Sequence, residues 1–186
     1  MTEPNKRPDP LLTPFKLGGL TLKNRIFSSS HAPNFLEAGL PGERYRHYHL
    51  EKARGGMALT MLGGSTNVSP DSPSVFGQVY AGDDSVIAPL ERIAEAVHSA
   101  GAAIMCQLTH MGRRSYNHGG SWLPIIGPSH TRERAHRGYP NAMDLHDIAR
   151  VQQDFAQAAR RCQQAGLDGI ELLAHGHLLG QFLSPA

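Results

Sequence analysis

The sequence predicts an α/β fold that is the first half of a TIM (β/α)8 barrel, with about four β/α units behind an N-terminal hairpin. Short, uniformly apolar segments alternate with segments of helical periodicity, the pattern of parallel strands covered by helices. The first strand runs into Ser-Ser-Ser-His without a glycine-rich turn, which disfavours a doubly wound open sheet. A complete barrel takes about 250 residues, so four units in 186 residues make about half of one.

The first part of the chain combines a leader, a hairpin, a strand and a helix. Residues 1–14 are polar and rich in proline, which is typical of a flexible leader. Apolar residues alternate around a Gly-Gly pair over 15–22, which indicates a hairpin. Residues 24–30 (NRIFSSS) could form a short buried strand, and 42–55 suit a helix ended by glycine.

The middle of the chain repeats the strand and helix pattern. A strand is predicted over 57–62 (MALTML), where it runs into Gly63-Gly64. A loop rich in proline and serine follows over 69–78, and apolar residues at helical spacing predict a helix over 87–99. The apolar run 102–108 (AAIMCQL) indicates another buried strand.

The last part begins with a long loop over about 111–143 that has little periodicity, and loops of this length are usually functional. A helix is expected from Asp144 to near Gly166, followed by a fourth strand over 169–173 (GIELL). We therefore expect a leader over 1–14 and a partial barrel domain over 15–186, truncated after its fourth strand.

The composition excludes several classes of protein. A net charge of +2, from 18 basic and 16 acidic residues that are well mixed, gives no basic stripe for nucleic acid. Cys106 and Cys162 lie far apart in apolar patterns, so we expect neither a disulfide framework nor a zinc knuckle. Neither a signal peptide nor a membrane span is evident, and a reduced, cytoplasmic protein is expected.

Polar residues follow each of the four predicted strands. The carboxyl ends of parallel strands form the reactive end of either architecture, so these residues are candidates for one pocket. They are Ser29, Ser30 and His31, then Ser65, then Gln107, and finally His175 and His177. The Gln107 side chain carries both a donor and an acceptor, which suits the edge of a planar polar cofactor.

Two other kinds of site are less well supported. Four histidines, at 31, 110, 175 and 177, could bind zinc, but no cysteine or carboxylate is placed to help them, and no metal is predicted. The adjacent Ser30 and His31 do not form a catalytic triad, and no G-x-S-x-G motif is present.

Several ordered motifs resemble the old yellow enzyme class of NADH:flavin oxidoreductases. They are LLTPFKLGGLTLKNRI, CQLTHMGRR (106–114), GPS (127–129) and DGIELLAHGHLLGQFLSP (168–185). The segments ERYRHYHLEKARGG, NVSPDSPSVFGQ and GHLLGQF are most similar to the branch with trimethylamine dehydrogenase, dienoyl-CoA reductase and the N-methylproline and dimethylglycine demethylases. The resemblance extends from about residue 10 to the end.

The resemblance implies FMN at the mouth of the barrel. By position, its contacts would be Ser29, Ser30, His31, Ala32, Ser65 and Gln107, with Gln107 on the pyrimidine edge of the flavin. His175 corresponds to a residue that helps bind a substrate oxyanion or amine, and His177 stands where a proton-donating tyrosine is usual. Full-length relatives also carry a 4Fe-4S cluster, FAD or NAD(P)H, for which ligands are absent here.

Two departures from the family pattern bear on chemistry. Ala32 stands where trimethylamine dehydrogenase has a cysteine joined to its flavin, so covalent attachment is not expected. Leu172 replaces one member of the usual His-x-x-His or His-x-x-Asn pair, and losing one donor weakens oxyanion stabilisation by a few kcal/mol. This change favours amine chemistry over carbonyl activation.

The expected reaction is therefore FMN-dependent oxidative N-demethylation of a small methylated amine or amino acid, with His175 and His177 as catalytic candidates. One alternative is an NAD(P)H-dependent ene or enoyl-thioester reductase. Another is an inactive half-barrel that needs the missing C-terminal half as its partner. A complete protein could form a homo-oligomer, and neither nucleic acid nor membrane is an expected partner.

Overall fold

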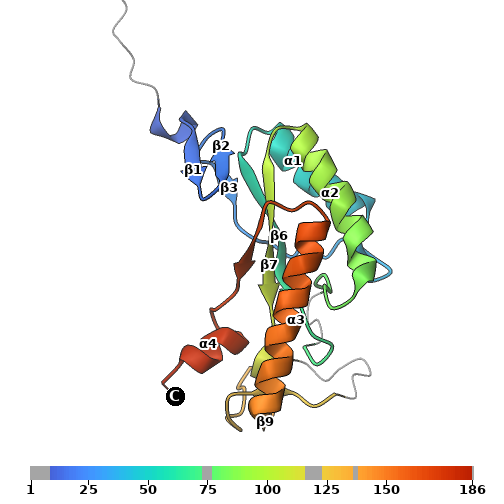
Figure 1. Ribbon diagram of the computed structural model, residues 1–186, viewed down its shortest axis with the longest axis vertical. Helices are drawn as coiled ribbons and strands as arrows, with labels where there is room; N and C mark the ends of the chain where they lie inside the picture. Colours follow the sequence, from blue (N-terminus) through green and yellow to red (C-terminus); the bar gives the residue numbers. More distant parts are fainter. Residues whose placement is uncertain (1–8, 73–76, 116–122, 136–137, 186) are drawn as a thin grey trace, which may run out of the picture.

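The computed structural model describes residues 9–72, 77–115, 123–135 and 138–185. Its centre is a parallel sheet of four strands in the order β10-β7-β6-β3 (Figure 1). The strands are β3 (Phe27–Ser28), β6 (Leu59–Asn67), β7 (Ala103–Thr109) and β10 (Gly169–Leu172). The helices between them are α1 (Glu43–Arg54), α2 (Ile87–Ser99) and α3 (Leu145–Gln164).

The two faces of the sheet are covered differently. Residues at alternate positions, such as Leu62, Ile104 and Leu108, are fully buried in one core with the apolar sides of α1, α2 and α3. On the opposite face, Leu59 packs against Leu22 of the N-terminal hairpin. The sheet is thus an arc with helices outside and apolar side chains inside, the arrangement of a barrel wall.

The N-terminal hairpin lies over the inner face of this arc. Its strands β1 (Phe15–Leu17) and β2 (Leu20–Leu22) pair antiparallel, as the sequence predicted. With Leu59, Met61 and Met105 it lines an apolar cavity of about 530 Å³. The hairpin therefore covers part of the inner face near the amino ends of the strands, leaving the carboxyl ends for a site.

The helices form where the sequence predicted them, because their signals are local. The α2 helix has the predicted limits, and α1 and α3 agree within two residues. A capping box starts α3, in which Asp144 and Asp147 bind each other's backbone N–H groups.

Two predicted strands differ from those in the structure. The segment 24–30 contributes only Phe27 and Ser28 to the sheet, and Phe27 is 59% exposed because β3 is an edge strand. The strand predicted to end at 62 continues to Asn67, because Gly63 and Gly64 form a bulge within it rather than a turn after it.

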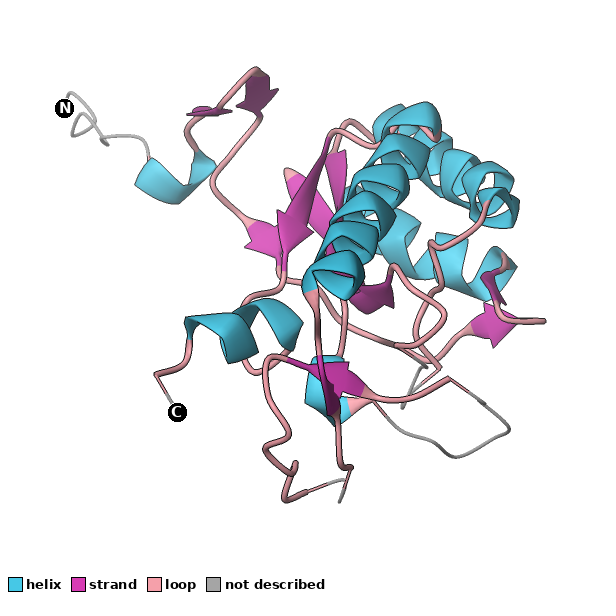
Figure 2. Ribbon diagram, turned by 60° about the horizontal axis from the view of Figure 1, so that its bottom comes forward, coloured by secondary structure: helices cyan, strands magenta, loops and turns pink. Residues whose placement is uncertain are grey.

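Several small elements were not predicted. The pair β4 (Leu36–Glu37) and β5 (Leu40–Pro41) precedes α1, and β8 (Ile126–Gly127) pairs with β9 (Asn141–Ala142) inside the predicted long loop. A short helix, α4 (Leu178–Leu183), follows β10; Figure 2 shows it beside the carboxyl-terminal end of the described chain.

Parts of three predicted segments lie outside the described residues. They are 1–8 of the leader, 73–76 of the loop after β6, and 116–122 with 136–137 of the long loop. Residues Pro10–Leu12 of the leader form a single 3-10 turn capped by Asp9. Among the described residues, no helix combines the length and apolar character needed to cross a bilayer.

Candidate functional site

The carboxyl ends of β3 and β6 are in direct contact. Gly64 has a φ of +65°, and a side-chain carbon added there would lie 2.3 Å from the Ala32 nitrogen and 2.5 Å from the His31 carbonyl carbon. Only glycine lets two backbones approach so closely. The bulge in β6 therefore positions the segment from Ser29 to Ala32, the first predicted cofactor contact.

Gln107 joins the ends of three strands. Its Oε1 accepts a hydrogen bond from the Ser65 backbone N–H at 3.0 Å, and its Nε2 donates to Glu171 at 2.6 Å. The side chain of Gln107 is directed along the same face as Glu171, because the two residues are register partners in β7 and β10. Gln107 is only 7% exposed, so its carboxamide is fixed in place.

The two predicted catalytic histidines occupy different environments. His175 is exposed, whereas His177 is 7% exposed and its Nδ1 is hydrogen-bonded to Thr109 Oγ1 at 2.6 Å. Burial, and then the positive charge of Arg114 and His175, lowers the pKa of His177 to about 4. His177 is therefore neutral near pH 7 and buried, whereas His175 is exposed.

The four histidines considered for zinc have separate partners. The His31 ring lies 6.3 Å from that of Tyr48, and His110 Nε2 lies 3.0 Å from Asp71 Oδ1. Among the described residues, the one group of three potential metal ligands is Asp144, His146 and Asp147, which contains none of these four.

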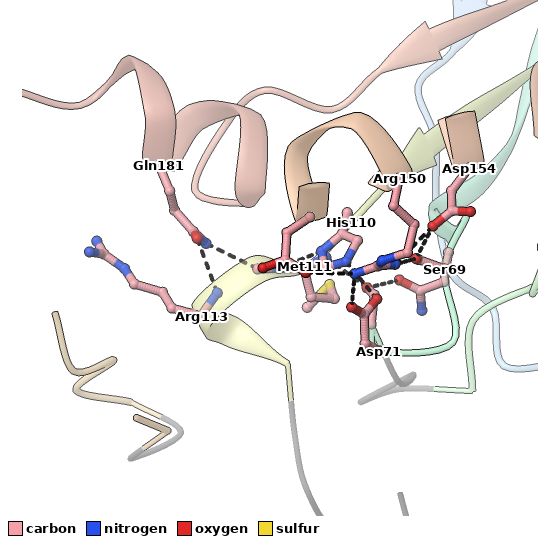
Figure 3. A network of polar contacts seen from close by, with 12 residues as sticks. Ser69, Asp71, His110, Met111, Arg113, Arg150, Asp154 and Gln181 are labelled. Carbon is pink, nitrogen blue, oxygen red and sulfur yellow. Dashed lines mark hydrogen bonds and ion pairs between the residues drawn. The ribbon is translucent and has the colours of Figure 1, made fainter. Parts of the chain in front are cut away.

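A partly buried polar network links the loop after β6 to the turn after β7 and to α3 (Figure 3). His110 Nδ1 accepts from the Gly112 N–H at 3.0 Å, so its Nε2 carries the proton donated to Asp71. Arg150 also binds Asp71, and its Nη1 lies 3.1 Å from both Ser69 Oγ and Asp154 Oδ2. The network holds these three elements in one arrangement.

The electrostatics of Asp71 reflect this network. Burial by itself raises the pKa of its carboxyl group, but the hydrogen bonds and positive charge of His110 and Arg150 outweigh that effect. The pKa of Asp71 therefore lies well below its ordinary value, and the carboxylate is ionised at neutral pH.

Gln181 of α4 fixes the segment that contains His175. Its Nε2 donates to the Met111 carbonyl oxygen at 3.0 Å, and its Oε1 accepts from the Arg113 N–H at 3.0 Å (Figure 3). Its Nε2 also donates to the Gly176 carbonyl oxygen at 3.3 Å. Gln181 is 6% exposed. The loop after β10 is thus attached to the turn after β7.

Sequence reasoning missed Asp71, Arg150, Asp154 and Gln181. Arg150 and Asp154 are four residues apart on one helix, a spacing that indicates a local ion pair but not its buried partners. Asp71 lies in a loop without periodicity, 79 residues from Arg150. Only the folded chain brings these groups together.

Thr109→Val tests the bond that orients His177. Valine keeps the shape but leaves the buried imidazole without a partner, so we expect a loss of about 1–2 kcal/mol in the free energy of unfolding, measured in urea. Thr21→Val, at an exposed position of β2, is the matched control and should change little. Equal losses in the two variants would show that the hydrogen bond contributes nothing.

Comparison with known proteins places this arrangement in a family. The family model for the NADH:flavin oxidoreductase / NADH oxidase family matches residues 10–186. A multifunctional alkene reductase/demethylase from Caballeronia cordobensis is 52% identical over 177 residues, which are 95% of this chain. A probable N-methylproline demethylase from Rhizobium meliloti is 51% identical, and an N,N-dimethylglycine/sarcosine dehydrogenase from Chromohalobacter salexigens is 45% identical, each over 95% of this chain. The chain spans about a quarter (26%) of the length of each of these three relatives.

Solved structures agree with this assignment. A morphinone reductase in complex with tetrahydroNAD is 26% identical and superimposes with a TM-score of 0.88, covering 95% of this chain and 53% of its own. The old yellow enzyme homologue from Zymomonas mobilis gives a TM-score of 0.87 at 26% identity, covering 95% of this chain and 52% of its own. The arc of strands and helices is thus part of an old yellow enzyme barrel, and the resemblance predicted from the motifs is confirmed: the chain belongs to the NADH:flavin oxidoreductase / NADH oxidase family.

Proposed function

We propose that residues 15–186 supply the first four β/α units of an FMN-binding barrel, with residues 1–14 as a leader outside it. Ser29, Ser30, His31, Ala32, Ser65 and Gln107 would hold the cofactor. The observation that carries this proposal is the Gln107 carboxamide, which is fixed by Ser65 and Glu171 at the carboxyl end of β7.

The donors and acceptors at this mouth fit a flavin. A carboxamide offers two N–H donors and two acceptor lone pairs, and Gln107 uses one of each within the protein. One donor and one acceptor remain for the edge of a planar ring that carries both. The hydroxyls of Ser29 and Ser30 and the exposed His31 ring lie on the segment packed against the Gly64 bulge, beside this edge.

The proposed reaction is oxidative N-demethylation of a small methylated amine or amino acid. When bound, FMN supplies the hydride acceptor. His175 is exposed on the loop attached by Gln181, so it would contact the substrate. His177 is neutral and held by Thr109, so it would add no positive charge near the substrate amine. Two relatives with at least 45% identity are named for demethylation or dehydrogenation of such amino acids.

Alkene reduction is the second candidate, because the relative from Caballeronia cordobensis is named for both activities. Leu172, 51% exposed and outside any polar cluster of the described residues, provides no second donor for a substrate carbonyl. We therefore rank N-demethylation first.

The two reactions are separated by a chimera in which residues 10–186 replace the matching segment of the Caballeronia relative. We expect formaldehyde from N-methylproline or N,N-dimethylglycine. NADH consumption with an enone, without formaldehyde from either amine, would favour the reductase instead.

We expect the isolated chain to be inactive, and turnover by it would refute the proposal that it needs the other half of a barrel.

Gln107→Leu in the same chimera tests the cofactor site. Loss of a donor and an acceptor should weaken FMN binding by at least about tenfold, measured by flavin fluorescence titration. The control is Gln153→Leu, an exposed glutamine on α3 that should leave the affinity unchanged. Unchanged affinity in a correctly folded Gln107→Leu protein would exclude Gln107 from the cofactor site.

A further inference from the structure

Arg114 is a cation at the mouth of the barrel without a carboxylate partner among the described residues. It ends the 3-10 turn Gly112–Arg114 that follows β7. Its side chain is partly exposed, yet its Nε is buried and makes no hydrogen bond within the described part of the chain. A partly exposed guanidinium with a buried nitrogen that lacks a hydrogen-bond partner is suited to receive a ligand.

The guanidinium of Arg114 lies against the loop that contains His175. A side-chain carbon added at Gly176, where φ is +69°, would lie 3.2 Å from Arg114 Nη1. Gln181 fixes the same loop through the Gly176 carbonyl oxygen, so the position of the loop relative to Arg114 is determined by hydrogen bonds. Arg114 and His175 thus occupy one edge of the mouth.

Three other partly buried arginines of the described chain are neutralised by carboxylates, whereas Arg113, next to Arg114, has no ion pair among the described residues. Arg46 pairs with Glu43 at 2.7 Å, Arg150 with Asp154 at 3.1 Å, and Arg161 with Asp84 at 2.7 Å. No described carboxylate lies within ion-pair distance of Arg114, and its neighbours His175 and His177 add no negative charge. The positive potential at this edge is therefore uncompensated by the described residues, which favours an anionic ligand.

We propose that Arg114 binds the carboxylate group of the substrate, so that the site selects methylated amino acids over simple methylated amines. This inference rests on the proposed function and deepens it by naming the substrate class. A guanidinium can hold a carboxylate through two parallel N–H···O bonds, which fixes the orientation of the substrate as well as its position. The amine group of the substrate would then point away from the turn after β7, toward the middle of the barrel mouth.

The test uses the 186-residue chain and two probes of similar size, N,N-dimethylglycine, which has a carboxylate, and N,N-dimethylglycinamide, which has a neutral carboxamide in its place. Binding is followed by NMR at neutral pH through the Gly176 backbone amide, which adjoins Arg114. We expect the carboxylate probe to bind at least about tenfold more tightly than the amide, the effect of hydrogen bonds to a charged group. Similar affinities, or no shift of the Gly176 resonance at saturating millimolar ligand, would overturn the proposal.

Arg114→Met should remove the preference for the carboxylate, and Arg114→Lys should keep part of it because the charge remains without the planar fork. Arg113→Met is the matched control, since it removes an equal charge from the same turn. An equal loss in the control would show general electrostatic attraction and refute a site at Arg114. Should Arg114→Met not fold, Arg114→Lys tests the same contact, and an undiminished preference in that variant would refute the bidentate site.

The two proposals fail in different ways. Carboxylate binding that depends on Arg114, without formaldehyde release by the chimera, would refute demethylation and retain the carboxylate site. Formaldehyde release that is unaffected by Arg114→Met at low substrate concentration would refute the carboxylate site and retain demethylation.

Discussion

Replacing Asp71 with asparagine will lower the free energy of unfolding by about 3 kcal/mol, a large fraction of the stability of a small domain. One carboxylate oxygen of Asp71 accepts from His110 at 3.0 Å, and the other binds Arg150. Asparagine has one carbonyl oxygen, so its NH2 group must face one of these two donors. This expected loss is at the lower end of the range for breaking a buried ion pair, because Arg150 also binds Asp154 and its side chain is 34% exposed. Urea denaturation measures the change.

The control for Asp71→Asn is Glu51→Gln. Glu51 pairs with Arg54 at 2.8 Å, but both side chains are more than 60% exposed, so water and salt screen the interaction. We expect no measurable change in stability for Glu51→Gln. A similar loss in both variants would mean that the network after β6 is no more stabilising than a surface ion pair.

The pH dependence gives a second measurement of the same network. The pKa of Asp71 is lower in the folded chain than its ordinary value of 3.8, so its contribution is complete above pH 4 and is lost as the pH falls below that value. The pKa of His177 is lowered from 6.5 to about 4, so its contribution is lost between those two values as the pH falls. Asp71→Asn should therefore still lose stability as the pH falls from 6.5 to about 4. Below pH 4 it should lose less stability than the unchanged chain.

The sequence was sufficient for the elements whose signals lie within a few residues. The α2 helix begins and ends where its apolar periodicity does, and α3 begins at the capping residue Asp144. The hairpin around Gly18-Gly19 is likewise local. Predicting these elements required no knowledge of what packs against them.

The sequence was insufficient where distant segments decide the structure. Gly63 and Gly64 have the appearance of a turn, yet β6 continues through them because β7 pairs with it again from Thr66 onward. Asp71 and His110 are 39 residues apart, and no pattern along the chain connects them.

Prediction of the candidate site met the same limit. Its place at the carboxyl ends of the strands followed from the order of the elements, and Gln107 followed from its chemistry. The partners of Gln107 could not be predicted in this way, because Glu171 faces Gln107 only through the register in which β10 pairs with β7. The exposed position of His175 and the buried position of His177 depend on α4, which was not predicted.

Gly64→Ala will lower the free energy of unfolding by about 3 kcal/mol or more and weaken FMN binding by the chimera. Alanine at a φ of +65° costs about 1–2 kcal/mol by itself. The added carbon would also lie 2.3 Å from the Ala32 nitrogen, so the backbone must move, which adds a cost typical of overpacking, about 1–3 kcal/mol. Urea denaturation and flavin titration measure the two effects.

Gly101→Ala separates the two contributions of Gly64→Ala. Gly101 has a similar φ of +69°, but no atom lies within 4 Å of a carbon added there, so only the conformational cost applies. The excess loss in Gly64→Ala therefore measures the contact between the β6 bulge and the segment after β3. An equal loss in both variants would mean that the segment after β3 can move away from the added carbon without loss of stability. Ser29 to Ala32 would then lack the fixed position that an FMN site on this arc requires.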